Sequence, residues 1–163
     1  MKLPTLNVDE LARLRMKECQ GTLLGGVKVA QGLGLSAEEF GYRMMMEQGI
    51  NWTHLCGSLD RIAHIFHEHY QVTYGFGSDL SVTLQDDTLC FDMPPLARAA
   101  AGQLQHWRLS TQVLEDVNRG FWRALNENAG ITASLEFTPD RHRRGIKPPS
   151  SPPTIAPRPP RWP

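Results

Sequence analysis

Residues 80–93 decide the fold of this chain, and their sequence is LSVTLQDDTLCFDM. On both sides of the Asp86-Asp87 pair, apolar and polar side chains alternate with a period of two, which is typical of a half-buried β-strand. A two-residue turn at this pair predicts an antiparallel hairpin with all apolar side chains on one face. The turn also predicts the cross-strand pairs, which are Leu84 with Leu89, Thr83 with Cys90, and Val82 with Phe91.

The same alternation returns in residues 131–138, ITASLEFT, which we predict to be a third strand. Most of the sequence before the hairpin, and the segment that follows it, is instead helical in pattern. We therefore expect an α+β domain in which a helical N-terminal half packs on one face of a small, mainly antiparallel three-strand sheet, made of hairpin 80–93 and strand 131–138.

The N-terminal helices are indicated by their caps. Asn7 and Glu10 have the spacing of a capping box, which predicts a helix from about Val8, and Ser36 with Glu39 predicts the start of a second helix. Glycines after Gln20 interrupt the first apolar stripe, so we expect that helix to bend or break there.

The third helix, expected at about 51–71, carries the most informative pattern. Its apolar side chains recur every three or four residues, and His69 falls inside the stripe that they form. Asn118 lies at the edge of a similar stripe in the helix expected after Ser110.

If both helices cover the sheet, His69 and Asn118 belong to a mainly apolar pocket, which is the usual composition of a small-molecule site. We therefore take His69 and Asn118 as candidate catalytic residues, with ligand-binding candidates Phe66, Tyr70, Phe121 and Trp122. The alternative is that His69 is a core histidine whose hydrogen bonds are formed with the backbone and not with a ligand.

The histidine-rich sequence HIFHEH at 64–69 offers a different chemistry. His64 and His67, three residues apart on one helix face, are candidate metal ligands, although the spacing is not that of an HExxH zinc site. A third ligand would have to come from elsewhere in the fold; the candidates are His54, Cys56, His106 or an acidic residue. His69 also suits an axial haem ligand, but the chain has no CxxCH motif. The alternative to a metal site is that His64 and His67 lie on a solvated helix face.

Cysteine supplies one more candidate. The three cysteines are an odd number without CxxC spacing, so we expect free thiols. Cys90 is placed by the hairpin on the polar sheet face, where it is a candidate nucleophile if a base lies nearby. The alternative is that Cys90 is simply a small residue on a solvated sheet face.

The charge and proline distribution predicts the domain boundary. The net charge is zero, but from Asp140 onward six basic residues accompany one acidic residue, together with eight of the twelve prolines. We expect a single domain over 1–139 and a basic, proline-rich, disordered tail over 140–163. The PxxP spacing in the tail resembles a ligand for a protein partner with an aromatic groove. An acidic body makes nucleic-acid binding an unfavoured interpretation.

Assembly and location are inferred from composition. Met44, Met45 and Met46 point in three directions around one helix, so we expect an exposed methionine surface and a homodimer with Met45 or Met46 near its interface. The sequence has no membrane-spanning run and no apolar leader, which predicts a cytoplasmic protein. Three hypotheses follow: a small-molecule-binding or small enzymatic domain around His69, a metal- or haem-binding protein, and an oligomeric interaction module without chemistry. We favour the first; whether it is an enzyme, and with which cofactor, stays open.

Overall fold

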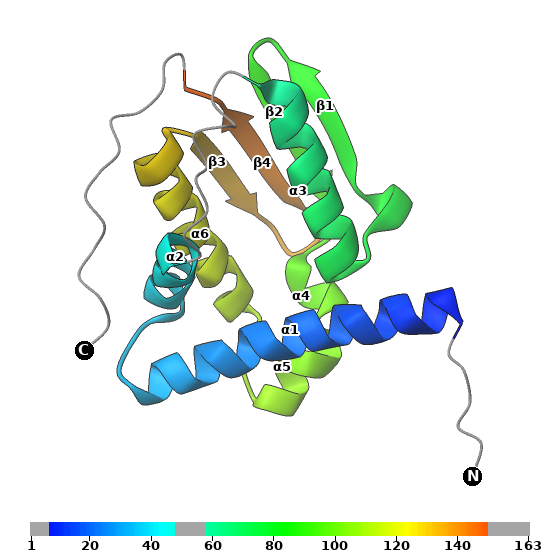
Figure 1. Cartoon of the computed structure of the whole chain (residues 1–163), viewed down its shortest axis with the longest axis vertical. Coiled ribbons are helices and arrows are strands. Elements are labelled where there is room, and N and C mark those ends of the chain that lie inside the picture. The colour runs from blue at the N-terminus through cyan, green and yellow to red at the C-terminus, as the bar shows by residue number, and fades with distance from the viewer. Residues whose placement is uncertain (1–6, 48–57, 150–163) are drawn as a thin grey trace.

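The computed structural model describes residues 7–47 and 58–149, which form helices on one face of an antiparallel sheet (Figure 1). Figure 1 shows α3 and α6 lying across the sheet, while α1 crosses near their ends. The predicted α+β class is confirmed. The helices are α1 (Val8–Gly32), α2 (Ala37–Glu47), α3 (Leu59–Tyr74), α4 (Leu96–Ala99), α5 (Ala101–Trp107) and α6 (Gln112–Ala129), with a short 3₁₀ turn at Gly77–Asp79.

The sheet has the strand order β1-β2-β4-β3, and every neighbouring pair is antiparallel. Its strands are β1 (Ser81–Gln85), β2 (Thr88–Met93), β3 (Thr132–Phe137) and β4 (His142–Lys147). The hairpin β1–β2 has the predicted register, including Val82 opposite Phe91. Asp86 adopts φ 55°, which is the left-handed conformation that a tight two-residue hairpin turn requires.

The number of strands was predicted wrongly, because β4 lies within the range assigned to the tail. It pairs with β2 on one side and β3 on the other, so it is an interior strand. Deleting everything after Pro139 would remove this strand from the middle of the sheet. The domain therefore continues past the predicted boundary. Residues 150–163 lie outside the described residues, so the disorder and the partner expected for them stay predictions.

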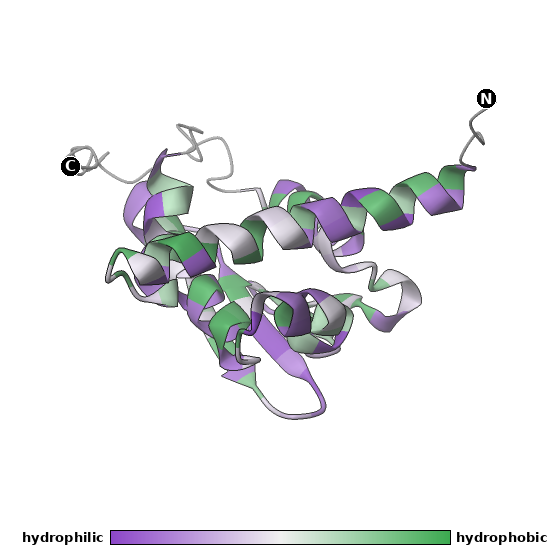
Figure 2. Cartoon of the chain, turned by 90° about the horizontal axis from the view of Figure 1, so that it is seen from below, coloured by the Kyte–Doolittle hydropathy of each residue, from purple (hydrophilic) through white to green (hydrophobic). Residues whose placement is uncertain are grey.

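Helix α1 runs unbroken through its glycines, so the predicted bend is wrong. These glycines let other elements approach closely: a Cβ on Gly25 would lie 3.0 Å from Cζ2 of Trp107, and one on Gly26 would lie 2.8 Å from Cζ of Phe40. Reciprocal 2.9 Å hydrogen bonds between Asn7 and Glu10 confirm the predicted capping box. The first half of α1 projects beyond the body (Figure 2).

Helices α2 and α6 make the closest contact between helices. A Cβ on Gly41 would overlap the carbonyl of Val117, and a Cβ on Gly120 would overlap the carbonyl of Glu38. Each helix therefore presents a glycine to the backbone of the other, which is why the two can pack so tightly. This contact fixes α2 against one side of α6.

The other helices complete the core over the sheet. Helix α3 is capped by Ser58 and ends at Gly75, beyond its predicted end at Gln71. Its buried side chains Ile62, Phe66 and Tyr70 face the sheet, where Phe91 of β2 contacts the rings of both Phe66 and Tyr70. Among the described residues, none of the helices has the length and apolar character needed to cross a membrane.

Candidate ligand-binding pocket

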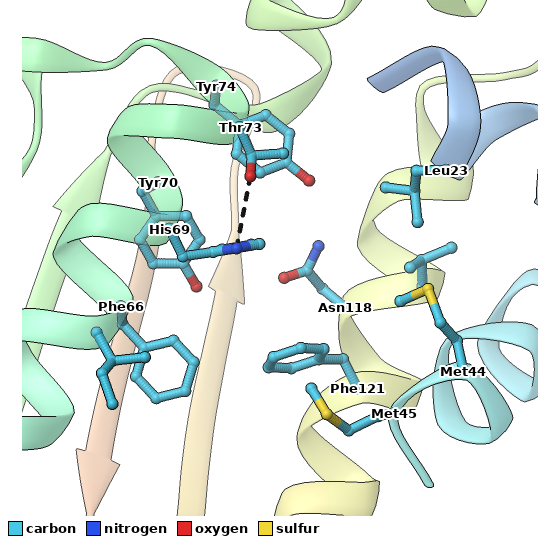
Figure 3. Close-up of a pocket in the computed structure, with 12 residues that line it drawn as sticks. Leu23, Met44, Met45, Phe66, His69, Tyr70, Thr73, Tyr74, Asn118 and Phe121 are labelled. Carbon is cyan, nitrogen blue, oxygen red and sulfur yellow. Dashed lines mark hydrogen bonds between the residues drawn. The ribbon is translucent and has the colours of Figure 1, made fainter. Parts of the chain in front are cut away.

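A cavity of about 160 Å³ lies between α3 and α6, with further walls from α1 and α2 (Figure 3). Most of its lining is apolar. Five residues that the sequence singled out are brought together here, namely Phe66, His69, Tyr70, Asn118 and Phe121. The remaining lining residues are Leu23, Met44, Met45, Ile65, Thr73, Tyr74 and Val117.

His69 stands at the wall of the cavity and not in the core. Its ring stacks at 6.3 Å on Phe121 and meets the edges of Tyr70 and Tyr74, while Oγ1 of Thr73 lies 3.5 Å from Nδ1 (Figure 3). The side chain is nevertheless exposed to solvent, so the prediction that His69 is mostly buried is wrong. The centre of the apolar stripe runs through Phe66 and Tyr70, and His69, one step of about 100° from Tyr70, falls at its edge.

The protonation of His69 is set by these surroundings. Protein atoms crowd the ring even though one side meets solvent, and this partial burial, with a smaller contribution from the positive charge of Arg144, lowers the pKa of His69 to about 4. The imidazole is therefore neutral at pH 7. A neutral ring has one donor nitrogen and one acceptor nitrogen, so His69 offers a ligand either kind of hydrogen bond.

Asn118, from α6, and Tyr74, from the end of α3, form the polar end of the cavity. Nδ2 of Asn118 donates to the carbonyl of Leu114 at 2.8 Å, and the amide group points toward His69 (Figure 3). Burial raises the pKa of Tyr74 to about 12, and a hydrogen bond with Asn118 opposes this shift. Both groups stay uncharged at neutral pH.

Trp122 does not line the cavity, contrary to the role predicted for it. Its ring is buried behind the wall, 4.7 Å from the ring of Phe66. Successive residues on a helix point about 100° apart, so α6 directs Phe121 into the cavity and Trp122 toward the sheet. Trp122 therefore supports the wall through Phe66.

Cys90 lies on the outer face of the sheet and is separated from the pocket by the sheet itself. It is half-buried in a depression together with Thr83, Ser134 and Gly145. The residues lining this depression within the described chain include no histidine. The structure thus brings no imidazole base to the candidate nucleophile.

The candidate metal ligands also lie away from the pocket. His64 is exposed and pairs with Glu68 at 3.2 Å, and His67 lies 3.4 Å from Gln71. Within residues 7–47 and 58–149, no group of three or more His, Cys, Asp or Glu side chains is arranged to hold a metal ion. His54 and Cys56 lie outside the described residues, and the ring of His106 packs on Trp107.

The methionines are covered within one chain. Met45 is 2% exposed, Met44 lines the cavity, and Sδ of Met46 accepts a 2.8 Å hydrogen bond from Asn128. The predicted exposed methionine surface is therefore wrong, since α6 and α1 supply the second layer. A homodimer stays a prediction, and it loses the argument on which it was based.

Two buried basic residues of β4 were missed by the sequence analysis. Arg144 and His142 are each 1% exposed and lie on the helix-covered face of β4. The only signal was a weak alternation in RHRRGIK, in which inward positions hold a histidine, an arginine and one aliphatic residue. A basic segment of this composition is typical of a solvated tail.

No known protein family, curated protein or solved structure matches the chain.

Proposed function

We propose that the protein binds a small, mainly apolar molecule of the size of one aromatic ring in the pocket between α3 and α6. The observation that carries this proposal is the cavity of about 160 Å³ with largely apolar walls. An engineered apolar protein cavity of about 150 Å³ takes up benzene, so the volume here suits a single ring.

The polar groups of the pocket support the same function. His69, Thr73 and Asn118 approach the cavity from two helices (Figure 3). A few fixed polar groups in an apolar cavity orient a ligand and give specificity, whereas a simple packing defect has no reason to gather them. The neutral imidazole of His69 suits hydrogen bonding to a ligand.

Binding is favoured over catalysis by the composition of the walls. No Asp, Glu, Cys or Lys is among the described residues that line the cavity. A neutral histidine without a carboxylate to orient it, and without a nucleophile beside it, lacks the partners that acid–base or covalent catalysis normally uses.

The proposal is tested by filling the cavity. Thr73 lines the pocket, while its neighbour Val72 is 60% exposed on the outside of α3. We expect Thr73→Phe to weaken binding of the neutral probe benzamide at least tenfold, because the new ring occupies the cavity. Val72→Phe, the matched control, should bind benzamide as the unchanged protein does. Binding is measured by NMR titration; equal affinity in both variants, or no binding by the unchanged protein, would overturn the proposal.

A further inference from the structure

Arg144 is a buried cation in the middle of the sheet. On β4, the side chains of His142, Arg144 and Ile146 point toward the helices, whereas Arg143 and Lys147 point outward to solvent. Arg144 is 1% exposed and has strand partners on both sides, Phe91 and Leu135. Its guanidinium is therefore enclosed between the sheet and α3.

Within the described part of the chain, the charge of Arg144 has no anion beside it. None of its three guanidinium nitrogens has a hydrogen-bond partner among the described residues. Its one favourable contact is with the ring of Tyr70, whose centroid lies 4.6 Å from Cζ. A cation–π contact returns less free energy than the removal of a guanidinium from water costs, so the arginine is incompletely compensated.

Neighbouring arginines on the same sheet show the contrast. Arg141 lies 2.6 Å and Arg143 lies 3.6 Å from the carboxylate of Asp92. These two are on the solvated side, where an unpaired charge would cost little. The residue that most needs an anionic partner is thus the one without it, which is the pattern expected of a ligand-binding arginine.

Arg144 lies directly behind the wall of the pocket. The ring of Tyr70 covers the guanidinium and also lines the cavity, so this one side chain separates the two. The guanidinium is close enough to His69 for its charge to act on that ring. A rotation of the Tyr70 side chain would join the charged group to the apolar cavity.

We propose that the ligand of this pocket is an anion, with a carboxylate on an apolar body of about one ring, and that Arg144 pairs with the carboxylate. This inference rests on the proposed function and names its ligand class. The guanidinium can donate two parallel hydrogen bonds to a carboxylate, a geometry that lysine cannot reproduce. The neutral His69 ring is placed to donate to the same group, and the apolar walls hold the ring of the ligand.

The test compares benzoate with benzamide, which have nearly the same shape and differ in charge. We expect the unchanged protein to bind benzoate at least tenfold more tightly than benzamide in NMR titrations at pH 7. Arg144→Met should remove this preference and leave the affinity for benzamide unaltered. Arg143→Met, the matched control on the outer face of the same strand, should keep the preference.

The outcomes separate the two proposals. Equal binding of benzoate and benzamide by the unchanged protein, or a preference that survives Arg144→Met, overturns the anionic ligand but leaves a ring-binding pocket. If the unchanged protein binds neither benzoate nor benzamide, both proposals are overturned.

Thermal melting without ligand is a second measurement. Arg144→Met should melt several degrees higher than the unchanged protein, because the substitution removes an uncompensated charge. A lower melting temperature would show that the protein itself compensates Arg144, and would contradict the inference.

Discussion

Helix α6 has α2 on one side and α3 on the other, and the two contacts are built differently. Toward α2, Gly41 and Gly120 bring the two backbones together, and polar side chains are paired along the seam. Toward α3, the contact is made by aromatic rings, which leave a cavity beside a guanidinium that has no hydrogen-bond partner among the described residues. One side of α6 is thus packed backbone against backbone, and the other side borders a cavity.

This difference explains why the pocket can be an opening without weakening the domain. On the α3 side the cavity wall is made of side chains, among them those of Tyr70 and His69. Helix α6 itself cannot shift away from α2 without separating the glycine contact.

The glycine contact should produce the largest effect when it is disturbed. In Gly120→Ala, the new Cβ would overlap the backbone of Glu38, and backbone atoms cannot turn aside as a flexible side chain does. We expect the free energy of unfolding to fall by about 3 kcal/mol, measured by urea denaturation. Gly102→Ala on α5 is the control, since nothing lies within 4 Å of its added Cβ. It should leave stability unchanged or raise it slightly. Similar values for the two variants would show that α2 and α6 are not packed as described.

Acidification should distinguish the two sides of α6. On the open side, the fold lowers the pKa of His69 to about 4, mainly through burial, and burial also lowers the pKa of His142 to about 4. Both histidines bind protons more readily in the unfolded chain, so their contribution to stability is complete above pH 6.5 and is lost as the pH falls toward 4. On the α2 side, the Arg43 side chain lowers the pKa of Glu39 below its usual value, so acid protonates this carboxylate later than it would an unpaired glutamate.

We therefore expect the free energy of unfolding to decrease between pH 6.5 and 4.5, with a slope of at most about 1.4 kcal/mol per pH unit from His142 and a smaller slope from His69, whose exposed side is screened by solvent. His142 is almost fully buried beside Glu115, so it supplies the larger part of this decrease in the free energy of unfolding. His142→Gln should flatten the profile, and the exposed His64→Gln should not. Urea denaturation across this range is the measurement. A flat profile for the unchanged protein would contradict the assignment.

The sequence predicted the elements whose residues carry a local pattern. The hairpin register follows from one two-residue turn and an alternation of apolar side chains, both contained in fourteen residues. The sequence also placed His69 and Asn118 at one pocket, because each lies in or beside the apolar stripe of its helix, although His69 is exposed and not buried as predicted. These inferences needed no knowledge of distant contacts.

The features that were missed depend on distant contacts. Strand β4 has one aliphatic residue on its inner face, so only its pairing with β2 and β3 reveals it as a strand. Met45 is covered by helices that a local pattern cannot place, and Gly120 looks like any glycine until Glu38 lies against it. Arg144 combines both difficulties, since its burial follows from its place in the sheet, and the lack of a hydrogen-bond partner among the described residues follows from the elements packed around it.

The smallest effect is expected at the polar seam between α2 and α6. Arg123 bonds to the carboxylates of Glu38 and Glu39, each at 2.9 Å, and its guanidinium lies 4.2 Å from the ring of Tyr42. The side chain is 41% exposed, so water already screens these interactions. Arg123→Ala should therefore lower the free energy of unfolding by no more than about 1 kcal/mol in low salt, and by less in 0.5 M salt. Arg123→Lys keeps the charge but cannot span both carboxylates. Its free energy of unfolding should therefore lie between those of the unchanged protein and Arg123→Ala. A loss as large as that of Gly120→Ala would mean that charge pairing, and not the close glycine contact, holds α2 on α6.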